Sequence, residues 1–401
     1  MKNDSYILSI DQSTSGTKAV LIDRSASVVA RSTIEHAQIF PQPGWVEHDP
    51  EEIYTNTLEA ISTVLKQSNT APSSIGCLSV SNQRETVLAW NRKTGRPIAN
   101  AVVWQCMRGE ALCRALKANG HEDMVRERTG LIIDPYFSAS GLAWLLENVE
   151  GARDLAKSGD LLAGTMDSWL VWKLTGGKVH ATDFTNASRT MLMDLHTLSW
   201  DPEIAALFNI PRSILPNILP SDEIFGETSA EGLFETEVPI SGIFGDSHAA
   251  LFGQRCFTAG MSKVTYGTGS SVMMNIGDMP SSAPGGLVTS VGFSIKNRTN
   301  FVFEGNIHST GATIKWMADS LKLLPSSAES AKIAASVEDT AGVIFIPAFA
   351  GLGAPYWNNT VRAAVLGITG GTTAAHLVRA GLESIAYQVK DLIDLMKEKA
   401  G

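Results

Sequence analysis

The stretch ILSIDQSTSGTKAVLID, residues 7–23, places an acid, several hydroxyl groups, a glycine and a lysine in one short reversal between two apolar runs. Asp, Ser, Thr and Gly are ordinary turn residues, so a simple polar hairpin accounts for the composition. The same groups also suit a metal-bound polyphosphate. Asp11 would then face the cation, while Thr14, Ser15, Lys18 and the loop N–H groups would face the phosphates. Both interpretations are open from this stretch alone.

A second candidate for chemistry is Asp246, which follows the apolar run VPISGIFG and precedes small residues that open a helix. In phosphoryl transfer, a carboxylate beside the acceptor can take the proton of the attacking hydroxyl. An Asp at this position is equally suited to cap the following helix. If the chemistry is phosphoryl transfer, Asp246 near the acceptor and Asp11 near the metal would suffice.

The segment NQRET, residues 82–86, lies between two apolar runs and carries Arg84 and Glu85. A solvated surface turn is one interpretation, and a pair that offers donors and acceptors to vicinal hydroxyls is the other. Trp104 and Tyr136 follow in the chain, and an aromatic wall with a few polar groups is typical of a site for a small polyol. An aromatic residue taken singly is more often part of the core.

Other reaction classes are excluded by missing motifs. The sequence has no GxxxxGK[ST] loop and no GxGxxG after its first strand, which excludes the P-loop and the dinucleotide-binding fingerprint. It also has no HExxH and no GxSxG. Ser247 and His248 next to Asp246 do not make a hydrolase triad, because neighbours at a helix start do not point at one another.

These residues need strands and helices to position them, and local patterns predict such elements. Two apolar runs flank the first reversal, a capped amphipathic helix follows, and a strand leads into Asp246. The predicted elements are strands over 7–10, 19–22 and 26–34, a helix over 49–67, strands flanking 82–86, a helix within 134–149, a strand and helix within 238–254, and a second hairpin over 261–277.

The second hairpin turns at Gly267–Ser271, and it is similar in composition and context to the first. Two such hairpins about 250 residues apart predict two related halves, each with a turn that faces phosphate. A clamp of two halves around a nucleotide explains both hairpins with one function.

The totals of the sequence agree with a globular α/β enzyme. The 401 residues correspond to two or three domains, and 44% hydrophobic content supplies sizeable cores. The net charge of −9 argues against nucleic acid as a partner. Four cysteines without CxxC pairing, no apolar run long enough to span a bilayer and no signal peptide predict a reduced, soluble, cytoplasmic protein without membrane insertion.

Taken together, the motifs resemble those of the FGGY carbohydrate kinases, in the family's order and over essentially the whole chain. The motifs that carry the resemblance are DQSTSGTK, PGWVEHDP, NQRET, TGLIIDPYFSA, GTMDSWLVWKLTGG, TDFTNASRTML, ISGIFGDSHAALFGQ, TYGTGSS, IPAFAGLGAPYW and GITGGTTAAHLVRAGLESIAYQ. The resemblance is greatest to the members that phosphorylate glycerol. It implies an α/β fold of two ribonuclease-H-like domains, of the actin and hexokinase kind, around a central cleft for ATP, Mg²⁺ and a polyol.

The resemblance also implies roles for individual residues, position by position. Asp246 would be the base, and Asp11 together with Asp246 would serve Mg²⁺ through its water ligands. The polyol would be bound by Arg84, Glu85, Trp104, Tyr136, Asp246 and Ser247. The phosphates and the nucleotide would be held by Thr14, Ser15, Gly16, Lys18, Thr268, Gly269, Gly311 and Lys315.

Two departures bear on the substrate. Ser247 stands where the glycerol-phosphorylating members usually have Gln, and Ser271 stands where they usually have an aromatic residue. Both changes would leave a roomier and wetter pocket. The expected reaction is transfer from ATP to glycerol, giving glycerol 3-phosphate. The alternatives are a larger polyol or ketose (erythritol, xylulose or ribulose), a non-catalytic polyol-binding member of the family, and another ATPase of the same clamp architecture.

The expected domains are residues 1–252, with the polyol site and the first phosphate loop, and residues 253–401 on the nucleotide side. Family members usually continue for about another hundred residues, with an Asp-Gly-Gly segment and an Asn at the adenosine. We therefore expect an incomplete second domain and weak nucleotide affinity in this chain. Homodimers and homotetramers are common in the family and are the expected assemblies.

Overall fold

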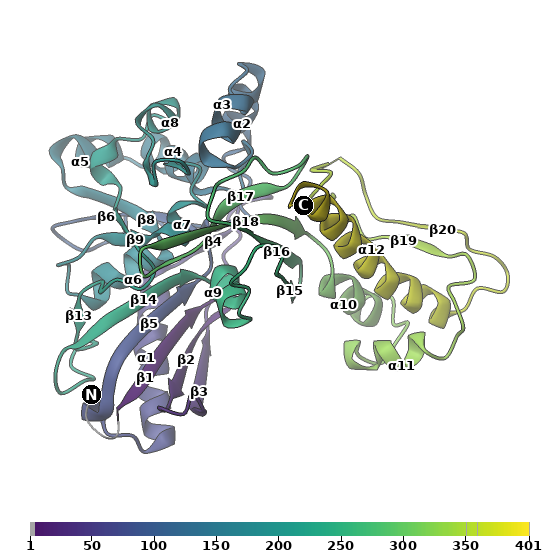
Figure 1. Ribbon diagram of the computed structural model, residues 1–401, viewed down its shortest axis with the longest axis horizontal. Coiled ribbons are helices and arrows are strands. Elements are labelled where there is room, and N and C mark those ends of the chain that lie inside the picture. Colours follow the sequence, from purple (N-terminus) through teal and green to yellow (C-terminus); the bar gives the residue numbers. More distant parts are fainter. Residues whose placement is uncertain (1–4, 350, 359, 401) are drawn as a thin grey trace. The chain divides into compact units, whose positions relative to one another are not determined.

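A computed structural model describes residues 5–349, 351–358 and 360–400 of the chain. The chain divides into two units (Figure 1). Unit 1 comprises residues 1–249 and 290–300, and unit 2 comprises residues 250–289 and 301–401. The predicted boundary at residue 252 lies close to this division but remains a prediction as a domain limit.

Unit 1 is built on a sheet of six strands in the order β13-β14-β5-β1-β2-β3. Strands β1 and β2 form the first hairpin and pair antiparallel, whereas β5 is parallel to both β1 and β14. In chain order the strands are β1 (Tyr6–Gln12), β2 (Gly16–Ile22), β3 (Val28–Glu35), β5 (Ile75–Asn82), β13 (Glu227–Thr228) and β14 (Val238–Gly245).

Smaller sheets complete unit 1. One sheet has four strands in the order β4-β7-β6-β8, and two further sheets have two strands each, β10-β11 and β12-β9. Their bounds are β4 (Glu47–His48), β6 (Val87–Asn91), β7 (Ala101–Val102), β8 (Leu161–Thr165), β9 (Ala181–Asp183), β10 (Met193–Asp194), β11 (Ser199–Trp200) and β12 (Asn217–Leu219).

The helices of unit 1 begin with α1, whose start is specified locally. Asp49 caps it by accepting a hydrogen bond from the Glu51 N–H at 2.9 Å, and Pro50 occupies the first turn. The helices are α1 (Pro50–Ser68), α2 (Glu110–Ala118), α3 (Glu122–Thr129), α4 (Ser138–Asn148), α5 (Ala152–Ser158), α6 (Met166–Leu174), α7 (Phe184–Ala187) and α8 (Pro202–Leu207), with short 3₁₀ turns η1 (Pro72–Ser74) and η2 (Arg212–Ile214). A further helix, α9 (Asp246–Gly253), begins in unit 1, and its residues from Ala250 on group with unit 2.

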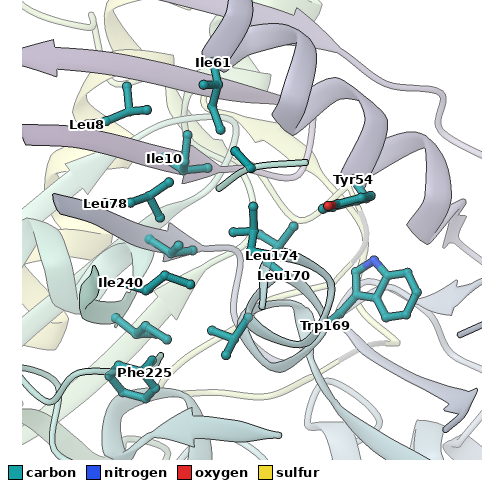
Figure 2. Close-up of a cluster of buried hydrophobic side chains, with 14 of the residues drawn as sticks. Leu8, Ile10, Tyr54, Ile61, Leu78, Trp169, Leu170, Leu174, Phe225 and Ile240 are labelled. Atoms are coloured by element: carbon teal, nitrogen blue, oxygen red, sulfur yellow. The ribbon is translucent and has the colours of Figure 1, made fainter. Parts of the chain in front are cut away.

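The core of unit 1 packs the large sheet against α1 and α6. Figure 2 shows Leu8, Ile10, Leu78 and Ile240, from adjacent strands, beside Ile61 of α1 and Leu170 of α6. All of these side chains are fully buried. Strand alternation produces this face, because every second residue of β1 points the same way. Apolar burial of this kind supplies the main driving force that holds the strand ends in place.

Unit 2 contains β15, β16 and most of β18 from a four-stranded sheet in the order β15-β16-β18-β17, together with a two-stranded sheet, β19-β20. Residues 290–300, which comprise most of β17, the turn after it and the first residues of β18, group with unit 1. The bounds are β15 (Ser262–Tyr266), β16 (Ser270–Gly277), β17 (Val288–Ile295), β18 (Arg298–Ile307), α10 (Gly311–Asp319), η3 (Ser327–Glu329), α11 (Ser330–Ala334), β19 (Ile344–Ile346), β20 (Ala364–Leu366) and α12 (Ala374–Ala400).

Most elements predicted from the pattern are confirmed. Both hairpins form, with turns between β1 and β2 and between β15 and β16. The predicted helix over 49–67 is α1, and the strand before Asp246 is β14. Within the described ranges, no helix has the length and apolar character to cross a membrane.

The matched pair Ile10→Ala and Ile7→Ala tests which face of β1 holds the core. Ile10 is fully buried, whereas Ile7 on the same strand is 43% exposed. We expect Ile10→Ala to lower the free energy of unfolding by about 2–5 kcal/mol, since it leaves a cavity. Ile7→Ala should cost well under half of that loss. Urea unfolding followed by circular dichroism measures both, and equal losses would contradict the assigned face.

Candidate active site

Three parallel strands of unit 1 end on one rung of the large sheet. Gln12 of β1 is paired with Asn82 of β5, which is paired with Gly245 of β14. Carboxyl ends of parallel strands share an edge, and ligands of α/β sheets bind outside that edge. The loop after β1, the corner after β5 and Asp246 after β14 therefore emerge along the same edge.

The first reversal is a tight hairpin with its charges paired. Asp11 and Lys18 face each other across β1 and β2, with 3.0 Å between the carboxylate and the ammonium. Ser81 on β5 donates a second hydrogen bond to Asp11 at 3.1 Å. Both charged side chains keep partial exposure to solvent, 33% for Asp11 and 45% for Lys18. This exposure leaves them accessible to an anion and its cation.

Gly16 is required where the hairpin meets the neighbouring strand. The Ser13 N–H donates to the Gly16 carbonyl at 2.9 Å, which closes the turn. A Cβ on Gly16 would lie 2.7 Å from the Ile34 carbonyl oxygen of β3. A side chain there would force β3 away, so the turn depends on the absence of one.

An aromatic side chain joins this loop to the predicted polyol wall. The Trp104 indole N–H donates to the Thr14 hydroxyl at 3.0 Å. Its ring meets Tyr136 edge to face, with 5.6 Å between the ring centroids. Because the indole fills an acceptor lone pair of Thr14, the hydroxyl hydrogen remains to donate to a ligand.

The corner at residues 83–86 is buried, which rejects the surface-turn interpretation. Glu85 is 3% exposed and has a positive φ of 62°, a conformation that costs energy in a residue with a side chain. Its carboxylate lies 2.6 Å from the Nε of the fully buried Arg189, and Ser138 donates to its carbonyl at 2.7 Å. These contacts hold the corner in its strained form.

The corner also brings two predicted residues together. The Arg84 Nε lies 3.2 Å from an oxygen of Asp246, and Arg84 is almost entirely buried while Asp246 is 39% exposed. The same oxygen accepts a hydrogen bond from the Ser247 N–H at 2.6 Å. Arg84 and the Ser247 N–H thus hold one side of the Asp246 carboxylate, while its other side is exposed to solvent.

A hydrogen-bond chain through the buried His48 links the corner to the predicted phosphate loop. Gln83 Nε2 lies 3.2 Å from His48 Nδ1, and His48 Nε2 lies 2.9 Å from the Gln38 side-chain oxygen. Gln38 in turn donates to the Thr14 carbonyl at 2.8 Å. Burial first, and then nearby His36, lower the pKa of His48 to about 3. A neutral imidazole, accepting at Nδ1 and donating at Nε2, fits both contacts.

The turn of the second hairpin packs on the start of α10 in unit 2. The carbonyls of Gly267 and Thr268 accept hydrogen bonds from the N–H groups of Gly311 and Ala312, at 2.9 and 3.1 Å. A Cβ on Gly311 would lie 2.4 Å from the Gly267 carbonyl oxygen, and one on Gly269 would lie 2.6 Å from the Ile307 carbonyl oxygen. Thr268, Gly269 and Gly311 are therefore neighbours.

Lys315 is the last of the predicted residues of unit 2, and Ser271 is the position that departs from the family's usual aromatic residue. Lys315 lies one turn into α10, exposed, with its ammonium 3.1 Å from Asp319. Ser271 is buried, where it donates to Glu304 at 3.0 Å and lies 3.4 Å from the Lys263 ammonium. The Ser271 hydroxyl is therefore engaged by Glu304 and Lys263, two other polar side chains of unit 2.

The acids that could serve Mg²⁺ fit a metal held largely by water. Asp11 is the second-last residue of β1 and Asp246 follows β14, so their backbones are about two strand spacings, or roughly 10 Å, apart. In the part of the chain that the structure describes, no three His, Cys, Asp or Glu side chains gather as a metal cage. Mg²⁺ usually keeps several waters and binds one or two carboxylates beside substrate phosphates.

Sequence reasoning assigned no role to several residues that build the site. Arg189, His48 and the buried acid Asp183 were missed, although two of them lie within the motif TDFTNASRTML. For Asp183 the available signal was an acid followed closely by hydroxyl and amide side chains, Thr185 and Asn186. Asp183 is fully buried and caps α7.

Comparison of the chain with known proteins identifies the family to which it belongs. Residues 6–253 match the N-terminal domain of the FGGY family of carbohydrate kinases, and residues 262–401 match the C-terminal domain. The chain is 52% identical over 391 residues to glycerol kinase 1 of Thermotoga maritima and 49% identical over 396 residues to glycerol kinase of Carboxydothermus hydrogenoformans. It covers 79% of each relative, and the matches cover 98% and 99% of this chain.

Solved structures show the same fold. Glycerol kinase of Plasmodium falciparum with ADP superposes with a TM-score of 0.92 at 37% identity, over 99% of this chain and 79% of that one. A ligand-bound xylulose kinase of Lactobacillus acidophilus superposes with a TM-score of 0.86 at 20% identity, over 98% of this chain and 78% of that one. At that lower identity the likeness concerns the fold alone.

His48 makes the stability of unit 1 depend on pH. Its folded pKa lies below the ordinary value of 6.5, so the unfolded chain binds the proton first as pH falls. The contribution of neutral His48 to the free energy of unfolding is fully present above pH 6.5 and declines as the pH falls toward 3. Between pH 7 and pH 5 we expect wild type to lose about 2 kcal/mol more free energy of unfolding than His48→Gln.

Urea unfolding at both pH values measures this difference. His196→Gln is the control, because His196 is exposed and should retain the pH response of wild type. If His48→Gln loses as much stability as wild type between the two pH values, a buried neutral His48 is ruled out.

Proposed function

Because the chain belongs to the FGGY family of carbohydrate kinases, we propose that it transfers the γ-phosphoryl group of ATP to a hydroxyl of a small polyol. Glycerol is the proposed acceptor and glycerol 3-phosphate the product. The observation that carries the proposal is the oriented, solvent-facing Asp246 beside Arg84, in a chain about half identical to glycerol kinases over nearly its full length.

The residues of unit 1 divide the work of the reaction. The polyol oxygen attacks the γ-phosphorus, the bond to the bridging oxygen of ADP breaks, and the Asp246 carboxylate accepts the hydroxyl proton. Arg84 orients Asp246 from the buried side. Trp104 and Tyr136 form an apolar wall for the carbon chain, while Glu85 holds the corner through Arg189.

Two groups of residues, one in each unit, are proposed to bind the nucleotide. Thr14, Ser15, Gly16 and Lys18 would meet its phosphates from unit 1. Thr268, Gly269, Gly311 and Lys315 would do so from unit 2. Asp11 and Asp246 would hold Mg²⁺ through its water ligands, and the bound ion would neutralise charge on the transferring phosphoryl group.

Ser247 supports a second candidate acceptor, a four- or five-carbon polyol or ketose. Its short side chain follows Asp246 directly, at the position where glycerol-phosphorylating members usually have Gln. A shorter residue there leaves more room beside the base for a longer carbon chain.

Asp246→Asn tests the proposed base. We expect polyol-dependent ADP formation to fall at least a hundredfold, because general-base catalysis typically contributes that much. Polyol binding should change only a few-fold, since the amide has nearly the same shape. A coupled ADP assay measures turnover, and Asp154→Asn, an exposed acid, is the control with unchanged rate. Turnover that survives in Asp246→Asn would remove Asp246 from the role of base.

Intrinsic tryptophan fluorescence tests the acceptor. Titration with glycerol, erythritol, xylitol, xylulose and ribulose should give a saturable change with glycerol that Trp104→Phe abolishes. Arg84→Gln should weaken that binding at least tenfold, whereas exposed Arg114→Gln should leave it unchanged. A response to a four- or five-carbon ligand without one to glycerol would favour the second candidate. No response to any ligand would contradict a polyol site in unit 1.

A further inference from the structure

Behind the proposed active site lies a fully buried carboxylate, that of Asp183, surrounded by donors. Its Oδ1 accepts from the Asn186 backbone N–H at 2.9 Å and from the Asn186 side-chain amide at 3.0 Å. Its Oδ2 accepts from the Thr185 N–H at 3.1 Å and from the Ser221 hydroxyl at 2.7 Å. Each carboxylate oxygen of Asp183 thus accepts a hydrogen bond from at least one N–H group, and an N–H group can only donate.

One branch from Asp183 reaches the end of β14. The Thr185 hydroxyl lies 2.7 Å from Asp183 Oδ2 and accepts a hydrogen bond from the Gly245 N–H at 2.9 Å. Because the Thr185 hydroxyl donates its hydrogen bond to Asp183, its oxygen is the acceptor for the Gly245 N–H. Gly245 directly precedes Asp246, so this contact sets where the proposed base leaves the sheet.

A second branch reaches the end of β5. Asn186 and Asn82 exchange side-chain hydrogen bonds, at 3.0 Å from Asn82 Nδ2 and at 2.9 Å from Asn186 Nδ2. Asn82 also donates to the Gln83 carbonyl at 2.8 Å, directly before Arg84. Because Asp183 accepts from the same Asn186 amide, it fixes which way that amide faces.

Ser221 provides a third contact with β14. Its hydroxyl donates to Asp183, and its carbonyl accepts from the Ile243 N–H at 3.0 Å. Burial raises the pKa of Asp183, and hydrogen bonds from Ser221, Asn186 and Thr185 act against that rise. The carboxylate therefore contacts groups bound to both strand ends that carry Arg84 and Asp246.

We propose that Asp183 is a positioning residue, which sets the mutual placement of Asp246 and Arg84 through Thr185 and Asn186. The inference rests on the proposed function, because it assigns Asp183 to that same site. The Thr185 branch would act on the base and hence on turnover. The Asn186 branch would act on Arg84 and hence on polyol affinity.

The test compares Thr185→Val, Thr185→Ser and Asn186→Ala with wild type in the full chain. For each, ADP formation gives kcat and the KM for glycerol, and urea unfolding gives the free energy of unfolding. Thr185→Val should lower kcat ten- to a hundredfold with KM within twofold, since small displacements of a reacting group cost rates of that size. Thr185→Ser should restore kcat to within threefold, and Asn186→Ala should raise KM more than it lowers kcat.

Thr175→Val is the matched control. Thr175 is also buried, and its hydroxyl also donates to an oxygen (Val171, 2.7 Å) and accepts from a backbone N–H (Val179, 3.2 Å). It should lose stability without losing kcat. If Thr185→Val loses only stability, as the control does, Asp183 has a structural role and the inference is overturned. If wild type itself forms no ADP with any polyol, the proposed function fails, and the inference that rests on it fails too.

Discussion

The shared rung at which β1, β5 and β14 end is the constraint on which the proposed active site depends. Pairing of Gln12 with Asn82 and of Asn82 with Gly245 brings three segments, far apart in the chain, to one edge. A slip of one residue in any strand would turn its buried side chains toward the opposite face. The apolar core that includes Leu8, Leu78 and Ile240 therefore fixes the register, and the register fixes where the polar residues emerge.

Directly behind that edge the interior is polar, which is costly unless every group has a partner. Both oxygens of Asp183 accept hydrogen bonds. The Glu85–Arg189 ion pair is buried, with at most 2% of either side chain exposed. Asp167, also fully buried, has a pKa raised to about 7 by burial and by the charge of Asp183. Removal of one partner from such a set leaves a buried charge uncompensated. These groups consequently behave as a fixed frame rather than as adjustable contacts.

Local sequence patterns predicted the parts of this arrangement that depend on periodicity and turn chemistry. The two hairpins, the capped helix α1, the corner at 82–86 and the strand before Asp246 all follow from such patterns. The pairing of Arg189 with Glu85 and the Asp183 branches could not be predicted, because their partners lie up to about a hundred residues apart in the chain. A buried polar residue has no periodic signature. It is recognised only when its partners are known.

The frame and the accessible residues have separate tasks. Arg84, Glu85, Asp183 and Arg189 are almost wholly buried, whereas Asp246, Lys18 and Trp104 retain exposure to solvent. Residues beside the proposed base, such as Ser247, can then change without disturbing the buried side chains that we propose orient it. The fold of this chain superposes on that of a xylulose kinase at 20% identity, and that likeness concerns the fold alone. A buried frame with an open edge is a scaffold on which residues at the edge can change independently of the residues that orient them.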